Sequence, residues 1–310
     1  MKAAICTRYG PPEVLQVRDI AKPSPKKNDM LIKIYATAIT ASDCIIRSFN
    51  VSPKLKLPMA IAIGFRRPRQ PILGMVMAGE IEAVGTDVST FQPGDRVFGC
   101  DFDRLKFGMY AEYVTFPESG MIAPMPANMS FEEAAAVSYG SLLALHFLRK
   151  GGIEQAKKVL IYGASGAIGT SAVQLARHYG ADVTGVCSTS NLDMVRSLGA
   201  GTVIDYTRED ITQRPERYDL VLNAVGKKKV QLQAESILTS NGKHVTVDDS
   251  KPKPKLADLL YLKNLAEIGA LKAVIDRCYP LEQIVEAHRY VDKGHKKGNV
   301  VITVTNDERI

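Results

Sequence analysis

A glycine-rich loop between an apolar run and a helical run constrains the fold of this chain more than any other feature. The segment reads VLIYGASGAIG, residues 159–169, and its glycines are Gly163, Gly166 and Gly169. An amphipathic helix is predicted directly after it, because apolar side chains recur at helical spacing. These side chains are Ile168, Ala172, Leu175, Ala176 and Tyr179.

A strand, a loop of small residues and a helix in this order are typical of a dinucleotide-binding site. Small residues let the backbone approach a pyrophosphate, and a helix N-terminus presents free N–H groups and a partial positive charge. The alternative left open is a tight strand-to-helix turn without a ligand. The loop residues expected to bind a cofactor are Gly163, Ser165, Gly166, Ala167, Ile168 and Gly169.

The second part of the chain alternates between apolar strands and helices, which predicts a parallel sheet with right-handed crossovers. A helix should start at the capping box of Ser130 and Glu133 and stop at Gly151 and Gly152. Another helix is expected at 191–198. The predicted strands are 158–162, 182–187, 202–205, 219–225 and 244–248.

The first part of the chain is instead rich in strands and turns, and a helix and a strand close the sequence. Residues 30–39 alternate, with Ile32, Ile34, Ala36 and Ala38 on one face. The other predicted strands are 2–8, 78–85, the run after the turn at 93–95, and 109–116, and the closing elements are a helix at 281–291 and a strand at 299–305.

Composition excludes several other classes. The 310 residues suggest about two domains. The five cysteines are dispersed without a CxxC pair, which argues against a zinc ribbon and fits reduced thiols in the cytoplasm. Neither a signal peptide nor a membrane-spanning run is recognisable, so no membrane partner is expected. The charge of +7 is scattered without interleaved aromatics, so no nucleic-acid partner is expected either.

The end of the second predicted strand bears on the choice of cofactor. An NAD site usually has Asp or Glu there, but this chain has Cys187 followed by Ser188, Thr189 and Ser190. No carboxylate in this segment would repel a 2′-phosphate, and three hydroxyls are available as donors. The pattern favours NADP(H), with a polar turn that accepts either cofactor as the alternative.

Several segments together resemble the medium-chain dehydrogenase/reductase superfamily, in its zinc-independent quinone oxidoreductase-like branch. They are AGEIEAVG, PGDRVFG, MYAEYV, GASGAIG, CSTSN followed by RSLGA, and GHKKGNVVITV, and they cover nearly the whole chain in the family's order. The resemblance implies a fold of class α/β. A Rossmann doubly wound parallel sheet, residues 127–271, is inserted into a GroES-like β-rich catalytic domain, residues 1–126 and 272–310, and the cofactor binds between the two.

The resemblance also implies a reaction without zinc. Thr40 stands where zinc-dependent members have a ligand cysteine, and Met75 and Val76 stand where they have His and Glu. A catalytic zinc needs three protein ligands, so no metal site is expected. Quinones and α,β-unsaturated carbonyls spread the charge of an incoming hydride over a conjugated oxygen, and a few hydrogen-bond donors then suffice.

The candidate catalytic residues are Thr40, as a donor to the substrate oxygen, and Tyr110, which lines the cleft or belongs to the core. Asp43 is expected to cap a helix together with Ser42 rather than to act as a base. The resemblance further assigns Tyr206 to the adenosine phosphate and Asn299 to the nicotinamide end. Asn223 completes the expected cofactor-binding set, together with the loop residues, Ser188, Thr189 and Ser190.

These residues predict a zinc-independent oxidoreductase that transfers hydride from NADPH to a quinone or an α,β-unsaturated carbonyl, its small-molecule partner. The alternative is an NADPH-binding protein with a regulatory or structural role and little catalysis. Leu143, Val76 and a short segment between Asp248 and Leu256 motivate that alternative, because they depart from the family pattern. The short segment also leaves room for a homodimer with an altered interface.

Overall fold

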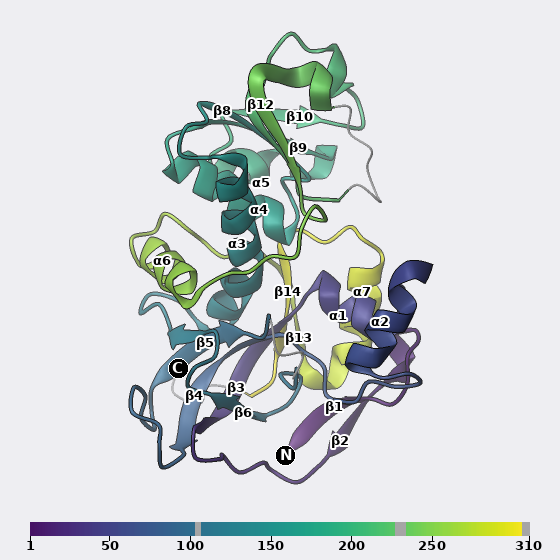
Figure 1. Cartoon of the computed structure of the whole chain (residues 1–310), viewed down its shortest axis with the longest axis vertical. Helices are drawn as coiled ribbons and strands as arrows, with labels where there is room; N and C mark the ends of the chain where they lie inside the picture. The colour runs from purple at the N-terminus through teal and green to yellow at the C-terminus, as the bar shows by residue number, and fades with distance from the viewer. Residues whose placement is uncertain (103–106, 227–233, 306–310) are drawn as a thin grey trace. The chain divides into compact units, whose positions relative to one another are not determined.

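The computed structural model describes residues 1–102, 107–226 and 234–305 and divides into two compact units (Figure 1). Unit 1 comprises Met1–Tyr139 and Ile275–Ile310, and unit 2 comprises Gly140–Val274. The division falls inside helix α3 (Phe131–Gly151). The predicted domain limits at 126/127 and 271/272 stay a prediction. None of the described helices is both long and apolar enough to cross a membrane.

Unit 1 is built on a seven-stranded sheet around β3 (Asp29–Ile39). One edge of β3 pairs with β4 (Val76–Val84), while β6 (Tyr113–Pro117) and β14 (Asn299–Thr303) share the opposite edge. The other strands are β5 (Arg96–Cys100), β7 (Ile122–Pro124) and β13 (Ile275–Pro280), and a separate two-stranded sheet contains β1 (Lys2–Cys6) and β2 (Leu15–Asp19). The helices are α1 (Ala41–Ser48), α2 (Pro53–Ile63) and α7 (Ile284–Asp292).

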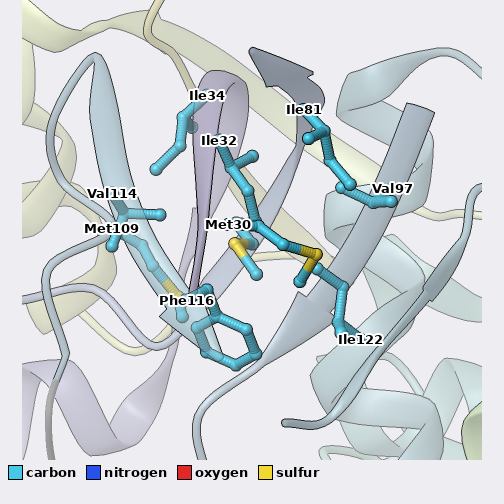
Figure 2. Close-up of a cluster of buried hydrophobic side chains, with 10 residues drawn as sticks. Met30, Ile32, Ile34, Ile81, Val97, Met109, Val114, Phe116 and Ile122 are labelled. Atoms are coloured by element: carbon cyan, nitrogen blue, oxygen red, sulfur yellow. The ribbon is translucent and has the colours of Figure 1, made fainter. Parts of the chain in front are cut away.

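The predicted alternation of residues 30–39 explains the core of unit 1. Met30, Ile32 and Ile34 point from one face of β3 into a buried cluster with Phe116 and Ile122 (Figure 2). The opposite face is buried as well, because the ring of Tyr35 stacks on Phe131 with 4.3 Å between the centroids. A strand buried on both faces can therefore occupy the centre of the sheet.

Several strands of unit 1 differ from the sequence prediction, which did not include β2, β7 or β13. The strand predicted from Met109 starts only at Tyr113, because the backbone before it bonds to β1: the amide of Ala4 donates to the carbonyl of Tyr110 at 2.8 Å. Strand β13 was not predicted. It lies at the edge of the sheet and most of its side chains are partly or fully exposed, so it lacks an apolar pattern.

Unit 2 contains a five-stranded parallel sheet in the order β10-β9-β8-β11-β12. Together with the β-rich unit 1, this sheet confirms the predicted α/β fold class. Its strands are β8 (Lys158–Tyr162), β9 (Asp182–Cys187), β10 (Thr202–Asp205), β11 (Tyr218–Asn223) and β12 (Leu238–Thr246). The helices wholly within unit 2 are α4 (Ala167–His178), α5 (Leu192–Ser197) and α6 (Leu256–Glu267).

The predicted helix boundaries of α3 are confirmed, whereas β12 and α6 differ from prediction. The amide of Ser130 donates to Glu133 Oε2 at 2.9 Å and the amide of Glu133 donates to Ser130 Oγ at 3.2 Å, which is a complete capping box. Strand β12 begins at Leu238, six residues before the predicted start, because a polar edge strand shows no apolar alternation. Helix α6 was not predicted.

Candidate functional site

The glycine loop lies at the carboxyl end of the central strand of unit 2. Strands β9 and β11 pair with opposite edges of β8, so the direction of strand order reverses at β8. Open parallel sheets bind ligands at such a switch point, outside the carboxyl ends of the strands. The loop that leaves β8 at Gly163 is therefore placed where a ligand is expected.

Two of the three glycines are required by the backbone itself. Gly163 has φ +79°, a conformation that L side chains rarely adopt, and a Cβ there would lie 2.5 Å from Val225 Cγ2. A Cβ on Gly169 would lie 2.1 Å from the carbonyl oxygen of Gly163. Gly169 thus lets α4 pack directly against the loop.

The middle glycine serves no such packing requirement. A Cβ on Gly166 would meet nothing closer than 3.7 Å, so the space in front of it is open. Gly166 is also the N-cap of α4, and no side chain caps that end and no acidic residue occupies its first turn. Free space beside an uncapped helix N-terminus fits the phosphates of a dinucleotide. The predicted residues Ser165, Ala167 and Ile168 are partly exposed beside it.

A carboxylate that the sequence reading missed lies beside the polar turn after β9. Thr189 Oγ1 donates to Asp205 Oδ2, and Thr207 donates to Asp205 Oδ1 through its amide at 2.9 Å and its hydroxyl at 2.7 Å. These hydrogen bonds, that of Thr189 first, lower the pKa of Asp205. Arg208 Nε lies 3.6 Å from Asp205 Oδ2 and its side chain is largely exposed.

The pairing register of β9 and β10 would have predicted that Asp205 lies beside this turn. Cys187 and Asp205 are paired in the parallel register of β9 and β10, so both strands end at the same level. The sequence predicted that the hydroxyls of Ser188, Thr189 and Ser190 are all available as donors. The hydroxyl of Thr189 is not, because it already donates to Asp205. Thr189 and Ser190 are exposed, and Ser188 Oγ accepts a hydrogen bond from Asn191 at 3.0 Å.

The two remaining predicted residues of unit 2 differ in exposure. The side chain of Tyr206 is about half exposed, with its ring 6.2 Å from that of Tyr162 between centroids. Asn223 is fully buried at the end of β11, where its Oδ1 accepts from the amides of Val225 at 3.0 Å and Gly226 at 3.1 Å. Asn223 thus shapes the backbone after β11.

In unit 1, Thr40 is the N-cap of α1 and forms a complete capping box with Asp43. Its hydroxyl accepts from the amide of Asp43 at 3.1 Å and donates to Asp43 Oδ2 at 2.7 Å, while the amide of Thr40 donates to the same oxygen at 2.8 Å. The prediction that Asp43 takes part in capping this helix is confirmed, but the prediction that Ser42 is the other residue of the cap is wrong. The partner is Thr40, and Ser42 Oγ instead lies 2.8 Å from the hydroxyl of Tyr139.

The carboxyl of Asp43 is fully buried, which raises its pKa to about 6 against the opposing hydrogen bonds from Thr40. Tyr110 lies beside it, fully buried, and its hydroxyl also lowers the pKa of Asp43. Neither that hydroxyl nor Asp43 Oδ1 has a hydrogen bond of normal geometry to a described residue. Tyr110 therefore belongs to the core of unit 1, where its hydroxyl influences the pKa of Asp43, and it is not exposed at the protein surface.

The polar cluster continues from Asp43 along α1 toward α7. Cys44 Sγ lies 3.7 Å from His288 Nδ1, and the ring of His288 meets that of Tyr110 edge-on at 5.6 Å. Burial, and then the charge of Arg47, lowers the pKa of His288 to about 3. The imidazole is neutral at physiological pH, and its Nε2 has no partner among the described residues.

The remaining predicted positions of unit 1 are buried. Asn299 begins β14 and is about 9% exposed, and Met75 and Val76 are also buried. In the described parts of the chain, no three His, Cys, Asp or Glu side chains are grouped so that they could hold a metal ion.

The fold and the glycine loop agree with the known proteins that this chain resembles. Residues 26–127 match the alcohol dehydrogenase GroES-like domain family, and residues 167–280 match the zinc-binding dehydrogenase family. The chain belongs to the medium-chain dehydrogenase/reductase superfamily.

Particular relatives narrow the comparison. The chain is 32% identical to the 2-methylene-furan-3-one reductase of Solanum lycopersicum, over 97% of this chain and 79% of that protein. It is 30% identical, over the same shares, to the chloroplastic NADPH-dependent alkenal/one oxidoreductase of Arabidopsis thaliana. The structure of the quinone oxidoreductase from Coxiella burnetii superimposes with a TM-score of 0.86 at 28% identity, covering 98% of this chain and 99% of that one.

Proposed function

We propose that this chain is an oxidoreductase that reduces a quinone or an α,β-unsaturated carbonyl with NADPH. The observation that carries the proposal is the open space at Gly166 beside the uncapped N-terminus of α4. The substrate class is supported by the relatives, whose names describe reduction of a methylene furanone, alkenals and enones, and quinones. They lend no support to a cofactor-binding protein with little catalysis.

The cofactor, when bound, supplies a hydride to the conjugated substrate, and a proton from water completes the saturated ketone or hydroquinone while NADP⁺ is formed. The loop of Gly163, Gly166 and Gly169 would hold its pyrophosphate. Thr40 would donate a hydrogen bond to the substrate oxygen, for which its hydroxyl must turn from Asp43 Oδ2. Zinc has no part in the proposal, because Thr40, Met75 and Val76 replace the ligands that zinc-dependent members use.

We assign NADPH rather than NADH from the surroundings of Asp205. Thr189 and Thr207 donate hydrogen bonds to its two oxygens and the cation of Arg208 lies 3.6 Å from Oδ2, so Asp205 would repel a 2′-phosphate less than a free carboxylate. Arg208 is largely exposed and would pair with that phosphate. Ser190, which directly follows Thr189, is exposed as well. Tyr206, Asn223 and Asn299 stay proposed cofactor residues on the resemblance alone.

The variant Gly166→Ala tests the cofactor site directly. Its Cβ fits the protein without a clash, so the fold should persist, but the methyl group would occupy the space proposed for the phosphates. We expect the KM for NADPH to rise about tenfold, which corresponds to about 1.4 kcal/mol of lost binding. Gly201→Ala is the matched control in the same unit, since its nearest neighbour is a side-chain oxygen at 3.3 Å.

Turnover tests the reaction. Loss of reduced-nicotinamide absorbance should follow addition of a simple quinone or an enone, and a chelator should leave the rate unchanged. Tight NADPH binding without turnover of any member of a panel of quinones and enones would refute the reductase. An unchanged KM in Gly166→Ala would refute the placement of the cofactor.

A further inference from the structure

A segment of unit 1 between α1 and β4 lacks acidic residues altogether. Between Asp43 and Glu80 there is no aspartate or glutamate, although the chain as a whole carries 33 of them. The same segment contains α2 and the loop that follows it, residues 64–69, and the structure describes all of it (Figure 1). Its basic residues are Arg47, Lys54, Lys56, Arg66, Arg67 and Arg69.

Helix α2 exposes apolar side chains to an extent that a helix of its composition rarely shows. Its sequence is PKLKLPMAIAI, so every residue other than Lys54 and Lys56 is apolar or proline. Helices that are apolar all round are normally buried. Here only Ala60 and Ile63 are buried. The exposed apolar residues are Leu55 at 50%, Leu57 at 63% and Ile61 at 55%, with Phe65 at 65% directly after the helix.

The loop after α2 presents cations that no carboxylate neutralises. Arg66, Arg67 and Arg69 are exposed and form no ion pair with any residue that the structure describes. Together with Arg18 and Phe65 they line a surface pocket of about 850 Å³.

The backbone holds this loop in a defined shape. The amide of Arg69 donates to the carbonyl of Ile63 at 2.7 Å, and the hydroxyl of Tyr9 donates to the carbonyl of Gly64 at 2.9 Å. Gly64 has φ +119°, and a Cβ there would lie 2.1 Å from the carbonyl oxygen of Arg67. The arginines are therefore presented from a tight turn that requires glycine.

We propose that α2 and residues 64–69 form a docking surface for an anionic lipid bilayer. Exposed apolar side chains enter the boundary between headgroups and acyl chains, and basic residues beside them bind lipid phosphates. Arginine is well suited to this contact because its planar guanidinium binds phosphate in a bidentate manner. The surface supplies both kinds of side chain within seventeen consecutive residues, 53–69.

Two other occupants explain less of this surface. A symmetric contact with a second copy would place the same cations against each other without a carboxylate between them. A small free anion would use the arginines but leave Leu57 and Phe65 exposed to water. The proposal goes beyond the reductase function and is measured without turnover. It also replaces the expectation of no membrane partner, which rested on the lack of a signal peptide and of a membrane-spanning run and did not consider binding at a bilayer surface. Binding to a bilayer would bring a quinone reductase to the membrane, in which quinones with long apolar tails dissolve.

Sedimentation with lipid vesicles tests the proposal on the full chain. We expect the protein to bind vesicles of phosphatidylcholine mixed with phosphatidylserine, to bind phosphatidylcholine alone much more weakly, and to lose binding at high salt. Arg66→Glu with Arg67→Glu should weaken binding to the mixed vesicles by more than about tenfold. Leu57→Gln with Phe65→Gln should weaken it by a similar factor, because the inserted apolar area is lost.

Matched control variants distinguish binding by this surface from the effects of net charge and of exposed apolar side chains elsewhere in the protein. Lys26 and Lys27 are adjacent and exposed, and their change to Glu alters the net charge as much as the arginine pair does. Ile268→Gln removes an apolar side chain that is 71% exposed elsewhere. Both controls should bind like the wild type. Equal losses in the controls, absence of binding to mixed vesicles, or a dimer that Leu57→Gln with Phe65→Gln dissociates would each overturn the proposal.

Discussion

Replacing Asp43 with asparagine should change how the stability of this protein depends on pH. Burial raises the pKa of this carboxyl from 3.8 to about 6, although Thr40 donates two hydrogen bonds to Oδ2. An asparagine oxygen could accept the same two hydrogen bonds, but the amide does not titrate. The variant Asp43→Asn therefore isolates the ionisation of one buried group.

The sign and size follow from proton linkage. Because the folded-state pKa lies above the unfolded value, the carboxyl's stabilising contribution is complete below about pH 4 and is lost as the pH rises through about 6. The shift is about two pKa units at about 1.4 kcal/mol each, so the loss by pH 7 is about 3 kcal/mol. Relative to the wild type, Asp43→Asn should gain about this much stability between pH 4 and pH 7.

Urea denaturation at a series of pH values, followed by circular dichroism, measures this difference. His288 has its pKa lowered to about 3 and also makes stability depend on pH, but both proteins contain it. Its contribution therefore cancels in the comparison. A difference in unfolding free energy that stays constant across the range, or that favours the wild type as the pH rises, would refute a raised pKa for Asp43.

Three further predictions concern the cofactor site, the packing of the glycine loop and a buried ion pair of unit 1. Arg208→Ala should raise the KM for NADPH about tenfold and leave that for NADH unchanged in steady-state assays, because a charged hydrogen bond to the 2′-phosphate is lost; equal effects on both would contradict the assignment. Gly169→Ala should cost about 3 kcal/mol in urea denaturation, since its Cβ would lie 2.1 Å from the carbonyl oxygen of Gly163, and wild-type stability would show that the loop relaxes freely. Asp292→Ala should cost about 3 kcal/mol by the same method, because it leaves the buried Arg47 guanidinium without its partner at 2.6 Å; Arg47→Met should cost less, and the reverse order would argue against an uncompensated buried charge.

Features encoded within a few consecutive residues could be predicted from the sequence. The capping box of Ser130 and Glu133 and the passage from β8 through the glycines into α4 need only local spacing, and the structure contains both. Thr40 was recognised from the family pattern. Its hydrogen bonds with Asp43 are local as well, yet the sequence pattern paired Asp43 with Ser42 instead.

Features that join distant segments could not be predicted in this way. Tyr110 reaches Asp43 only through the folding of unit 1, and Asp205 meets Thr189 only through the pairing of β10 with β9. Strand β13 and the first half of β12 lie at sheet edges, where polar residues are as acceptable as apolar ones. Solvent exposure of α2 was equally hidden, because its apolar composition predicts burial.

The position of β14 in its sheet affects how the chain folds while it is being translated. Unit 2 is a continuous stretch of sequence, but the central strand β3 receives β14 only from the far end of the chain, with Val301 opposite Ala38. A nascent chain that still lacks β14 holds part of the edge of β3 unpaired, and such an edge invites pairing with other chains. Translation that stops early would thus yield an aggregation-prone product whose Rossmann unit has all its strands.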